Sequence, residues 1–377
     1  MIAEISPART AVSLSSLLCL DDVEDAATHA MAADLRDFVA GGAGTETTLR
    51  ANRTALERVR LVPRVLNDVS ACSTETTVLG TSTTMPVLVA PMAYQRLAHP
   101  EGERALAAAC AGAGVIYVAS MLSSSTFVDI TATGASTWCQ LYWLRDRGQM
   151  TNLLRRAESA GCRAVVLTVD VPRMGRRLRD IRSGFTLPAG ISAVNLSGDV
   201  GVHDGSDSES AFMAHTRLTF DPSLSWSDLD WLRQRTSLPI VVKGVLHPDD
   251  AQRAAELGVD ALIVSNHGGR QLDGAVSSAE ALPAVREVVG DRCEVLMDSG
   301  IRSGSDVVKA IALGASSVLI GRPAWWGLAL AGQAGAARVL ELIRQETEDA
   351  VALAGCRGIA DVRSSVRALP AAESWSW

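Results

Sequence analysis

A short pattern recurs four times along the chain: an alanine-rich stretch, a glycine, and then a short aliphatic run. It occurs in LAAACAGAGVIYVAS (106–120), RRAESAGCRAVVLTV (155–169), RAAELGVDALIVS (253–265) and KAIALGASSVLIG (309–321). The first part is typical of the end of a helix, glycine is favoured directly after a helix, and the last part has the length of a buried strand. Each copy is therefore predicted to be the helix and second strand of a βαβ unit.

Four further apolar runs bring the predicted strands to eight. They are PVLVAP (86–91), TWCQLYW (137–143), LPIVVKG (238–244) and CEVLMDSG (293–300). Successive strands begin about 22 to 33 residues apart, except for a gap of about 75 residues between the fourth and the fifth. Apolar strands that alternate with helices indicate a parallel α/β sheet, and the number eight favours closure into a (β/α)8 TIM barrel. A doubly wound open sheet is the alternative fold.

The rest of the chain is predicted to decorate this barrel, so that residues 1–377 form one domain. Residues 1–85 contain a helical segment (23–38), the glycine-rich AGGAGTETT and a predicted hairpin around VLGTSTTMP, and we expect them to cap the barrel. Residues 171–222 fill the long gap and include GDVGVHDGSDSES, which is too polar for a core. We expect this segment to be a mobile lid over the active site.

Composition excludes several classes of protein. The net charge of −7, with no Lys/Arg run longer than two residues, argues against a nucleic-acid partner. The most apolar stretch, residues 105–122, has no charged residue, but it is alanine-rich and contains two glycines, which favours a buried helix, turn and strand over a membrane span. The start, MIAEISPART, lacks the basic and apolar regions of a signal peptide. The seven cysteines form no C-x-x-C pair, so we expect ordinary thiols in the cytoplasm and no metal site.

In a TIM barrel the chemistry lies at the C-terminal ends of the strands. The residues that end the eight apolar runs, in strand order, are Pro91, Met92 and Ala93; Ser120; Gln140 and Tyr142; Thr168 and Asp170; Lys243; Ser265, His267 and Arg270; Asp298 and Arg302; Gly321 and Arg322. Any one of them has an ordinary structural interpretation, such as a loop salt bridge. Their joint placement at one rim favours an active site.

The loops after the last two strands favour a phosphate site. DSGIRSGSD and LIGRPAW each place glycines and an arginine directly after a strand. Glycines let backbone N–H groups approach an anion, and arginine supplies a forked positive charge. In this fold the same two loops commonly bind a phosphate, so we expect a phosphorylated cofactor or substrate. The alternative is a pair of surface arginines after ordinary turns.

Seven motifs resemble those of the FMN-dependent 2-hydroxy acid oxidase and dehydrogenase family, which includes glycolate oxidase, lactate oxidase and mandelate dehydrogenase. They are APMAYQRLAHPEGE (90–103), QLYWLRDR (140–147), LTVDVPRMGRRLRD (167–180), VVKGV (241–245), SNHGGRQLDG (265–274), DSGIRSGSDVVKA (298–310) and IGRP (320–323). The resemblance runs from about residue 14 to residue 363. Within the family, AYQRLAHPEGE, QLYWLRD and MGRRLRD resemble the branch of mandelate and 4-hydroxymandelate oxidases.

The resemblance implies a set of residues that act on the substrate: His267, Asp170, Tyr142, Arg177, Arg270 and Lys243. In that set His267 is the base and Asp170 pairs with its other ring nitrogen. Arg177 and Arg270 bind the substrate carboxylate, Tyr142 bonds to the 2-hydroxyl, and Lys243 lies by the N1/O2 edge of the flavin. This agrees with the chemistry, because oxidation of a 2-hydroxy acid needs a base, a carboxylate anchor and an electron acceptor at one place.

The resemblance also implies that the cofactor is FMN. The implied FMN contacts are Pro91, Met92, Ala93, Ser120, Gln140, Thr168, Lys243, Ser265, Asp298, Gly300, Arg302, Gly321 and Arg322. By the resemblance, Ala93, Ser120, Gln140 and Thr168 contact the ring or the ribityl chain, and the last five contact the phosphate end.

Departures from the family pattern bear on the substrate. Phe38 stands where members that act on small aliphatic acids usually have a tyrosine, and Leu122 stands where glycolate oxidase has a tryptophan. Both changes favour an aryl substrate, although Phe38 also has an interpretation as core. Ser299 replaces the middle glycine of the commoner D-G-G, a change that a small side chain permits. Trp325 and Trp326 are predicted to pack in the outer helix or at a subunit contact rather than against substrate.

The sequence therefore predicts an FMN oxidase that converts (S)-mandelate or 4-hydroxymandelate to the 2-keto acid and reduces O2 to H2O2. The alternatives are a dehydrogenase with a quinone or protein acceptor, an oxidase of lactate or glycolate, a flavin-free aldolase that uses Lys243 as a Schiff base, and a non-catalytic homologue. We also expect a homotetramer in the cytoplasm that has no membrane attachment.

Overall fold

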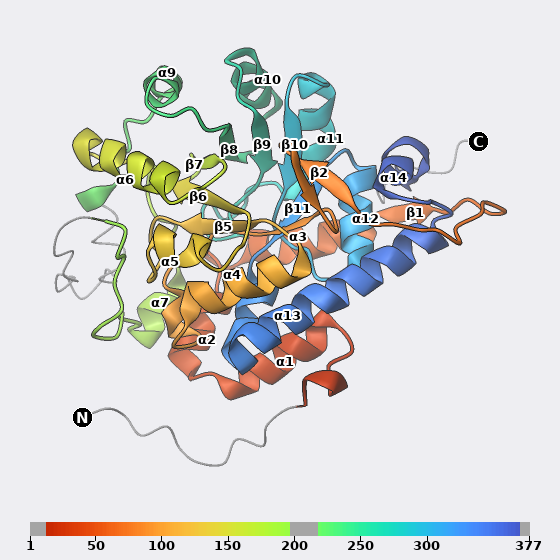
Figure 1. Cartoon of the computed structure of the whole chain (residues 1–377), viewed down its shortest axis with the longest axis horizontal. Helices are drawn as coiled ribbons and strands as arrows, with labels where there is room; N and C mark the ends of the chain where they lie inside the picture. Colours follow the sequence, from red (N-terminus) through yellow and green to blue (C-terminus); the bar gives the residue numbers. More distant parts are fainter. Residues whose placement is uncertain (1–12, 197–217, 370–377) are drawn as a thin grey trace.

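The computed structural model describes residues 13–196 and 218–369, and Figure 1 shows the whole chain. The polar stretch of the predicted lid, residues 198–210, lies outside the described residues.

Eight parallel strands form a closed barrel at the centre of the molecule. In ring order they are β4 (Val87–Val89), β5 (Tyr117–Ser120), β6 (Thr137–Leu141), β7 (Val165–Thr168), β8 (Ile240–Val245), β9 (Ala261–Val264), β10 (Glu294–Met297) and β11 (Ser317–Ile320). Strand β11 pairs with β4, which closes the ring. The predicted (β/α)8 TIM barrel is thereby confirmed, and the open doubly wound sheet is wrong.

Helices follow the strands and cover the outside of the barrel. They are α4 (Gly102–Ala113), α5 (Phe127–Thr131), α6 (Arg147–Ser159), α7 (Leu178–Ser183), α9 (Asp228–Arg233), α10 (Pro248–Glu256), α11 (Ser278–Val289), α12 (Gly304–Ala312) and α13 (Arg322–Leu353). In the four repeats a glycine with positive φ follows the helix: Gly114, Gly161, Gly258 and Gly314. The predicted function of these glycines in ending the helices is confirmed.

The inside of the barrel is filled by one large apolar side chain from most strands. Leu88, Trp138, Ile263 and Leu319 are each at most 1% exposed and belong to one cluster that is separate from the apolar layer under the helices. A β-strand points successive side chains to opposite faces, so alternate residues supply the two layers. The barrel is therefore a packed core, and only its rim can hold a ligand.

A hairpin closes the N-terminal end of the barrel. Strands β2 (Thr76–Val78) and β3 (Thr81–Thr83) pair antiparallel, at the predicted hairpin. Val78 joins the cluster inside the barrel, and the Leu79 N–H donates to Glu294 Oε1 at 2.9 Å, at the start of β10. This leaves the C-terminal ends of the strands as the open face.

The N-terminal helices pack around the opposite end and side. They are α1 (Leu20–Ala30), α2 (Ala33–Ala40) and α3 (Thr47–Arg58), after a short 3-10 turn at Leu14–Ser16. Helices α1 and α4 flank the long helix α13, which is kinked at Ala331 and Gly332 (Figure 1). The single helical segment predicted over 23–38 is wrong in detail, because an extended backbone at Met31 and Ala32 divides it. The break gives α2 its own direction and lets it bring Phe38 to the cavity.

The remaining elements were not predicted. They are a second 3-10 turn at Gln95–Leu97, helix α14 (Ile359–Ser365), and an antiparallel pair of β1 (Arg60–Val62) with β12 (Arg367–Leu369). Within residues 13–196 and 218–369, no helix has both the length and the hydropathy needed to cross a bilayer. The apolar stretch 105–122 is divided between α4 and β5, as predicted.

Candidate active site

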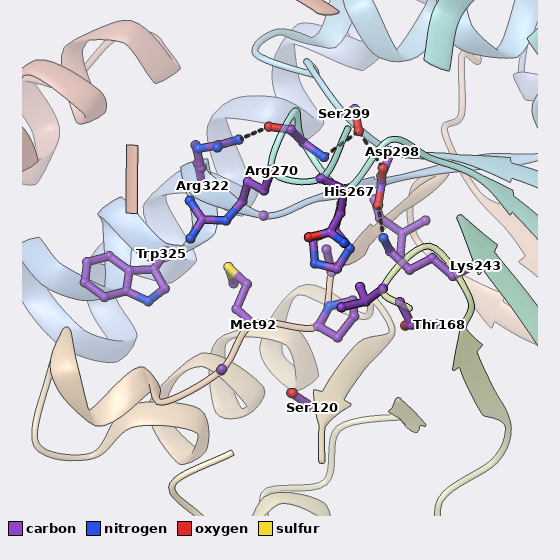
Figure 2. A pocket seen from close by; sticks show the side chains of 18 of the residues that line it. Met92, Ser120, Thr168, Lys243, His267, Arg270, Asp298, Ser299, Arg322 and Trp325 are labelled. Atoms are coloured by element: carbon purple, nitrogen blue, oxygen red, sulfur yellow. Dashed lines mark hydrogen bonds and ion pairs between the residues drawn. The ribbon is translucent and has the colours of Figure 1, made fainter. Parts of the chain in front are cut away.

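A cavity with an empty volume of about 1230 Å³, which includes open solvent at its mouth, lies at the C-terminal rim of the barrel. The predicted site residues that line it are Phe38, Pro91, Met92, Ala93, Ser120, Tyr142, Thr168, Arg177, Lys243, His267, Arg270, Asp298, Gly300, Arg302, Gly321 and Arg322. Figure 2 shows ten residues of the cavity wall by name, among them His267, Lys243 and Arg322. The structure thus collects at one place side chains that are up to 284 positions apart in the chain.

Three other predicted residues lie directly behind this lining. Gln140 donates from Nε2 to Thr168 Oγ1 at 3.0 Å and accepts a hydrogen bond from Ser120. Ser265 accepts from Lys243 Nζ at 2.8 Å, and Asp170 is bonded to His267. Each of the three therefore acts on the cavity through a neighbour that lines it.

His267 and Asp170 form the pair expected of a catalytic base and its support. His267 Nδ1 lies 3.0 Å from Asp170 Oδ1, which leaves Nε2 for the substrate. Withdrawal from water lowers the pKa of His267; Asp170 opposes this shift, while Lys243 adds to it. Burial acts to raise the pKa of Asp170, but His267 and Lys243 outweigh it and the pKa is lowered. The pair is therefore an ionised carboxylate beside a neutral imidazole, which is the form that accepts a proton.

The backbone around His267 is held in an unusual conformation. His267, Gly268 and Gly269 have φ values of 60, 66 and 74 degrees. A side chain at position 269 would place its Cβ 2.6 Å from the backbone of Leu49, so glycine is required there by space as well as by φ. The two glycines turn the chain tightly enough for His267 and Arg270 to line the same cavity.

Two arginines supply the positive charge expected for a substrate carboxylate. Arg270 donates to Gly41 O at 2.6 Å, and its guanidinium lies 5.6 Å from the centre of the Phe38 ring. Burial lowers the pKa of Arg270, as do the neighbouring charges of Arg177 and Arg322. Arg177 Nε is buried without a hydrogen-bond partner. Positive charges crowded in this way favour an anion between them.

Lys243 forms a buried ion pair in the wall of the cavity. Its Nζ lies 3.0 Å from Asp298 Oδ2, and both side chains are less than 10% exposed. Burial alone acts to lower the pKa of Lys243, but Asp298 and Asp170 outweigh it and the pKa is raised. Lys243 is therefore a fixed positive charge, and a charged amine cannot attack a carbonyl to form a Schiff base.

The far end of the cavity is cationic and glycine-lined. Burial lowers the pKa of Arg322 to about 9, and the charge of nearby Arg302 contributes to the shift. Arg322 donates to the carbonyl groups of Val39, Gly41 and Gly268, and Arg302 packs over the Trp326 ring at 4.9 Å. These two charges and the cavity-lining backbone of Gly300 and Gly321 fit a phosphate dianion.

The cavity as a whole fits FMN. Arg302 and Arg322 would hold its phosphate, Lys243 would lie by the polar edge of its ring, and Met92 and Ala93 would supply apolar contacts. Among the described residues, no group of three or more His, Cys, Asp or Glu side chains has an arrangement that holds a metal ion.

Several lining residues escaped the sequence analysis as site residues. They are Val39, Ala90, Val171, Met174, Phe220, Gln271, Ile301, Leu319, Ile320 and Trp325. Phe220 stacks on Tyr142 with ring centres 4.5 Å apart, and it is 5% exposed. It lies in the long gap between the fourth and fifth strands, where no periodicity marks it. Trp325 and Trp326 are both buried in α13, as predicted, and Trp325 also lines the cavity.

Comparison with known proteins agrees with this geometry. Residues 27–368 match the model of the FMN-dependent dehydrogenase family. The chain is 50% identical to 4-hydroxymandelate oxidase of Amycolatopsis orientalis over 91% of its length and 96% of that protein. It is 44% identical to L-lactate oxidase of Nostoc sp. over 94% of its length and 98% of that protein.

A solved structure gives the same result in three dimensions. The crystal structure of mandelate oxidase with (S)-4-hydroxymandelic acid superposes with a TM-score of 0.91 and 49% sequence identity. The similarity covers 94% of this chain and 99% of that one. A match of this extent, with the cavity and its charges at the C-terminal rim of the barrel, establishes that the chain belongs to the FMN-dependent dehydrogenase family.

Proposed function

We propose that this protein oxidises an aryl 2-hydroxy acid, (S)-mandelate or (S)-4-hydroxymandelate, to the 2-keto acid, and that O2 takes up the electrons to give H2O2. The observation that carries the proposal is the convergence in one cavity of the His267–Asp170 pair, the Arg177 and Arg270 guanidinium groups, and two phenylalanine rings. The similarity to 4-hydroxymandelate oxidase supports the choice of substrate.

The charged residues bind and orient the acid. Arg177 and Arg270 hold the substrate carboxylate, because a guanidinium offers paired N–H donors to its two oxygens. Tyr142 lines the same cavity and donates to the 2-hydroxyl. Burial raises the pKa of Tyr142, so the phenol keeps its proton and remains a donor. Fixing both groups at once limits the acid to one orientation at the base.

The histidine removes the proton. His267 Nε2 accepts a proton from the bound acid, and Asp170 stabilises the imidazolium that results. When bound, FMN supplies the two-electron acceptor that protein side chains lack. Lys243 contributes a positive charge that favours a negatively charged reduced cofactor.

The aromatic residues select the substrate. Phe38 stacks on Phe185 with ring centres 4.4 Å apart, and Phe220 stacks on Tyr142. Both phenylalanines line the cavity, and each is less than 9% exposed. Phe38 is thus core and cavity wall at once, so the two interpretations of this residue are compatible. Such walls favour a phenyl group over a methyl or hydrogen.

The test is anaerobic reduction of the purified yellow protein by a panel of 2-hydroxy acids. The mandelates should bleach the flavin absorbance, with lactate and glycolate slower, and readmitted O2 should yield one H2O2 per acid consumed. Bleaching by lactate or glycolate but not by mandelates would exclude the aryl substrate. Bleaching by mandelates without peroxide would indicate a dehydrogenase with another acceptor.

We further propose a homotetramer in the cytoplasm, on the basis of the family resemblance. Light scattering after size exclusion should give four times the chain mass of 39.7 kDa. Fractionation of the source cells should recover the activity with soluble proteins. A dimer or monomer mass, or activity in the membrane fraction, would reject the respective proposal.

A further inference from the structure

Ser299 adopts a backbone conformation that disfavours any side chain. It is the second residue after β10, with a φ of 79 degrees, and it is 8% exposed. In this left-handed region a Cβ crowds the backbone, so glycine is the residue of lowest cost. A strained residue persists where its side chain makes contacts that offset the strain.

The Ser299 hydroxyl makes two hydrogen bonds, one to each side of the site. It donates to Asp298 Oδ1 at 2.7 Å and accepts from the Gly268 N–H at 2.9 Å. Asp298 in turn holds Lys243 through its other oxygen at 3.0 Å. Figure 2 shows this chain of contacts from Lys243 to the loop that carries His267.

The loop of His267 depends on bonds of this kind. Its three successive left-handed residues donate their N–H groups to side-chain oxygens: His267 to Ser265 Oγ, Gly268 to Ser299 Oγ, and Gly269 to Asn266 Oδ1. Ser265 and Asn266 belong to the same loop, and their side chains tie it to Lys243 of β8 and to Asn52 of α3. Ser299 comes from the next strand and therefore fixes the loop relative to β10.

We propose that Ser299 is a positioning residue: its hydroxyl holds His267 in place against the substrate and, through Asp298, tunes the charge that Lys243 presents to the cavity. The first half of this inference rests on the proposed function. A glycine at 299 would relieve the backbone strain but would leave the Gly268 N–H and Asp298 Oδ1 each without this partner. The serine is thus more than a small residue that the turn permits.

Loss of the Ser299 hydroxyl should make the electrostatic potential in the cavity less positive. The hydroxyl donates to the Asp298 carboxylate and so disperses part of its negative charge. Without that bond the carboxylate compensates Lys243 more completely, and the positive potential in the cavity falls. A negatively charged reduced flavin is then less stable, so the midpoint potential of the bound FMN should decrease.

The experiment compares Ser299→Gly with Ser299→Ala, since both lose the hydroxyl but only the first relieves the strain. Both holoproteins should be reduced by saturating mandelate about tenfold more slowly than the parent, because a hydrogen bond to a charged or buried group is lost. The acid concentration for half-maximal rate should change much less. The glycine variant should melt at a higher temperature than the alanine variant.

A matched control separates the effect of relieving backbone strain from the effect of losing the contacts that position His267. Leu66 also has a positive φ, of 61 degrees, and its side chain is fully exposed. Leu66→Gly should raise the melting temperature and leave the reduction rate unchanged. A parental reduction rate in Ser299→Gly would overturn the positioning of His267.

The midpoint potential is measured by dye equilibration, without any hydroxy acid, and should be lower than the parental value in both Ser299 variants. An unchanged potential in both would overturn the charge effect through Asp298 and Lys243. If no 2-hydroxy acid reduces the parent protein, the proposed function fails, while the potentials still decide whether Ser299 tunes the cofactor. Binding of FMN to the apoproteins, followed by fluorescence, verifies that each variant retains its cofactor site.

Discussion

Asp170 presents one carboxylate oxygen to His267 and buries the other without a hydrogen-bond partner. Oδ1 lies 3.0 Å from His267 Nδ1, whereas no group in the described structure donates to Oδ2. A buried carboxylate normally keeps its charge through several donated hydrogen bonds. Here His267, which is hydrogen-bonded to Oδ1, and the charge of Lys243 hold the pKa of Asp170 low despite its burial. The negative charge of Asp170 is therefore available to stabilise the imidazolium that forms when His267 accepts a proton.

Replacing Asp170 by asparagine should remove this stabilising charge with little change in the shape of the side chain. An amide cannot stabilise the imidazolium, so Asp170→Asn should slow flavin reduction by about 10²- to 10⁴-fold, the range that general acid–base catalysis supplies. Stopped-flow absorbance of the holoprotein with mandelate gives the rate. Asp291→Asn is the control, because that side chain is 98% exposed. A loss of less than tenfold in Asp170→Asn would remove Asp170 from the base pair.

The reduction rate should fall in acid because protonated His267 cannot act as a base. Its pKa is lowered from 6.5 by withdrawal from water, against the effect of Asp170 and with that of Lys243. The apparent pKa of the rate at low substrate should therefore lie below 6.5. An apparent pKa above 6.5 in the stopped-flow profile would contradict the conclusion that burial is the dominant influence on the pKa of His267.

The lowered pKa of His267 should also make the free energy of unfolding depend on pH. The unfolded chain takes up a proton on His267 at a higher pH than the folded protein does, so acid favours unfolding. The contribution of His267 should be complete above pH 6.5 and lost as the pH falls toward its folded value. The melting temperature of the parent relative to that of His267→Gln should therefore fall as the pH is lowered across this range. Parallel curves would argue against the shift.

Phe220 should set the preference for aryl substrates. Segment 219–221 is fixed to the loop between β6 and α6 by the Leu144–Phe220 bridge, and to the start of α6 by the Arg147–Asp221 ion pair of 2.7 Å. Phe220→Leu removes a ring that contributes about 0.5–1.5 kcal/mol when it stacks, so kcat/KM for mandelate relative to 2-hydroxybutyrate should fall about two- to tenfold. Phe127→Leu is the control, since Phe127 is equally buried but lies outside the cavity lining. An unchanged ratio in Phe220→Leu would limit Phe220 to packing.

Arg302 should contribute to the affinity for FMN. Its side chain is 14% exposed, and a hydrogen bond to a charged group is worth about 1.5–3 kcal/mol. Arg302→Met should therefore raise the Kd of FMN about 10- to 100-fold, as measured by fluorescence titration of the apoprotein. Arg163→Met provides the comparison, because Arg163 is exposed at the start of β7. Equal Kd values in both variants would place the phosphate elsewhere.

The repeated helix, glycine and strand pattern determined the barrel and the location of its site. Parallel strands that all begin at one end must all finish at the other, so residues that follow the apolar runs, such as Lys243 and Arg322, necessarily share a rim. Local chemistry was also readable, because the glycines beside His267 indicate a tight turn whatever surrounds them. These features depend on the order of residues along the chain and on backbone preferences.

Other features were decided only when distant segments packed together. Phe220 and Tyr142 are 78 positions apart, and nothing in the sequence of either segment predicts that their rings stack. Trp325 has the sequence context of an outer helix, yet its place in the first turn of α13, at the rim of the barrel, makes it line the cavity. The hydroxyl of Ser299 finds Gly268 because β9 and β10 are neighbours at a particular register. Contacts of this kind depend on side-chain directions at ångström resolution, which a pattern of apolar and polar residues does not encode.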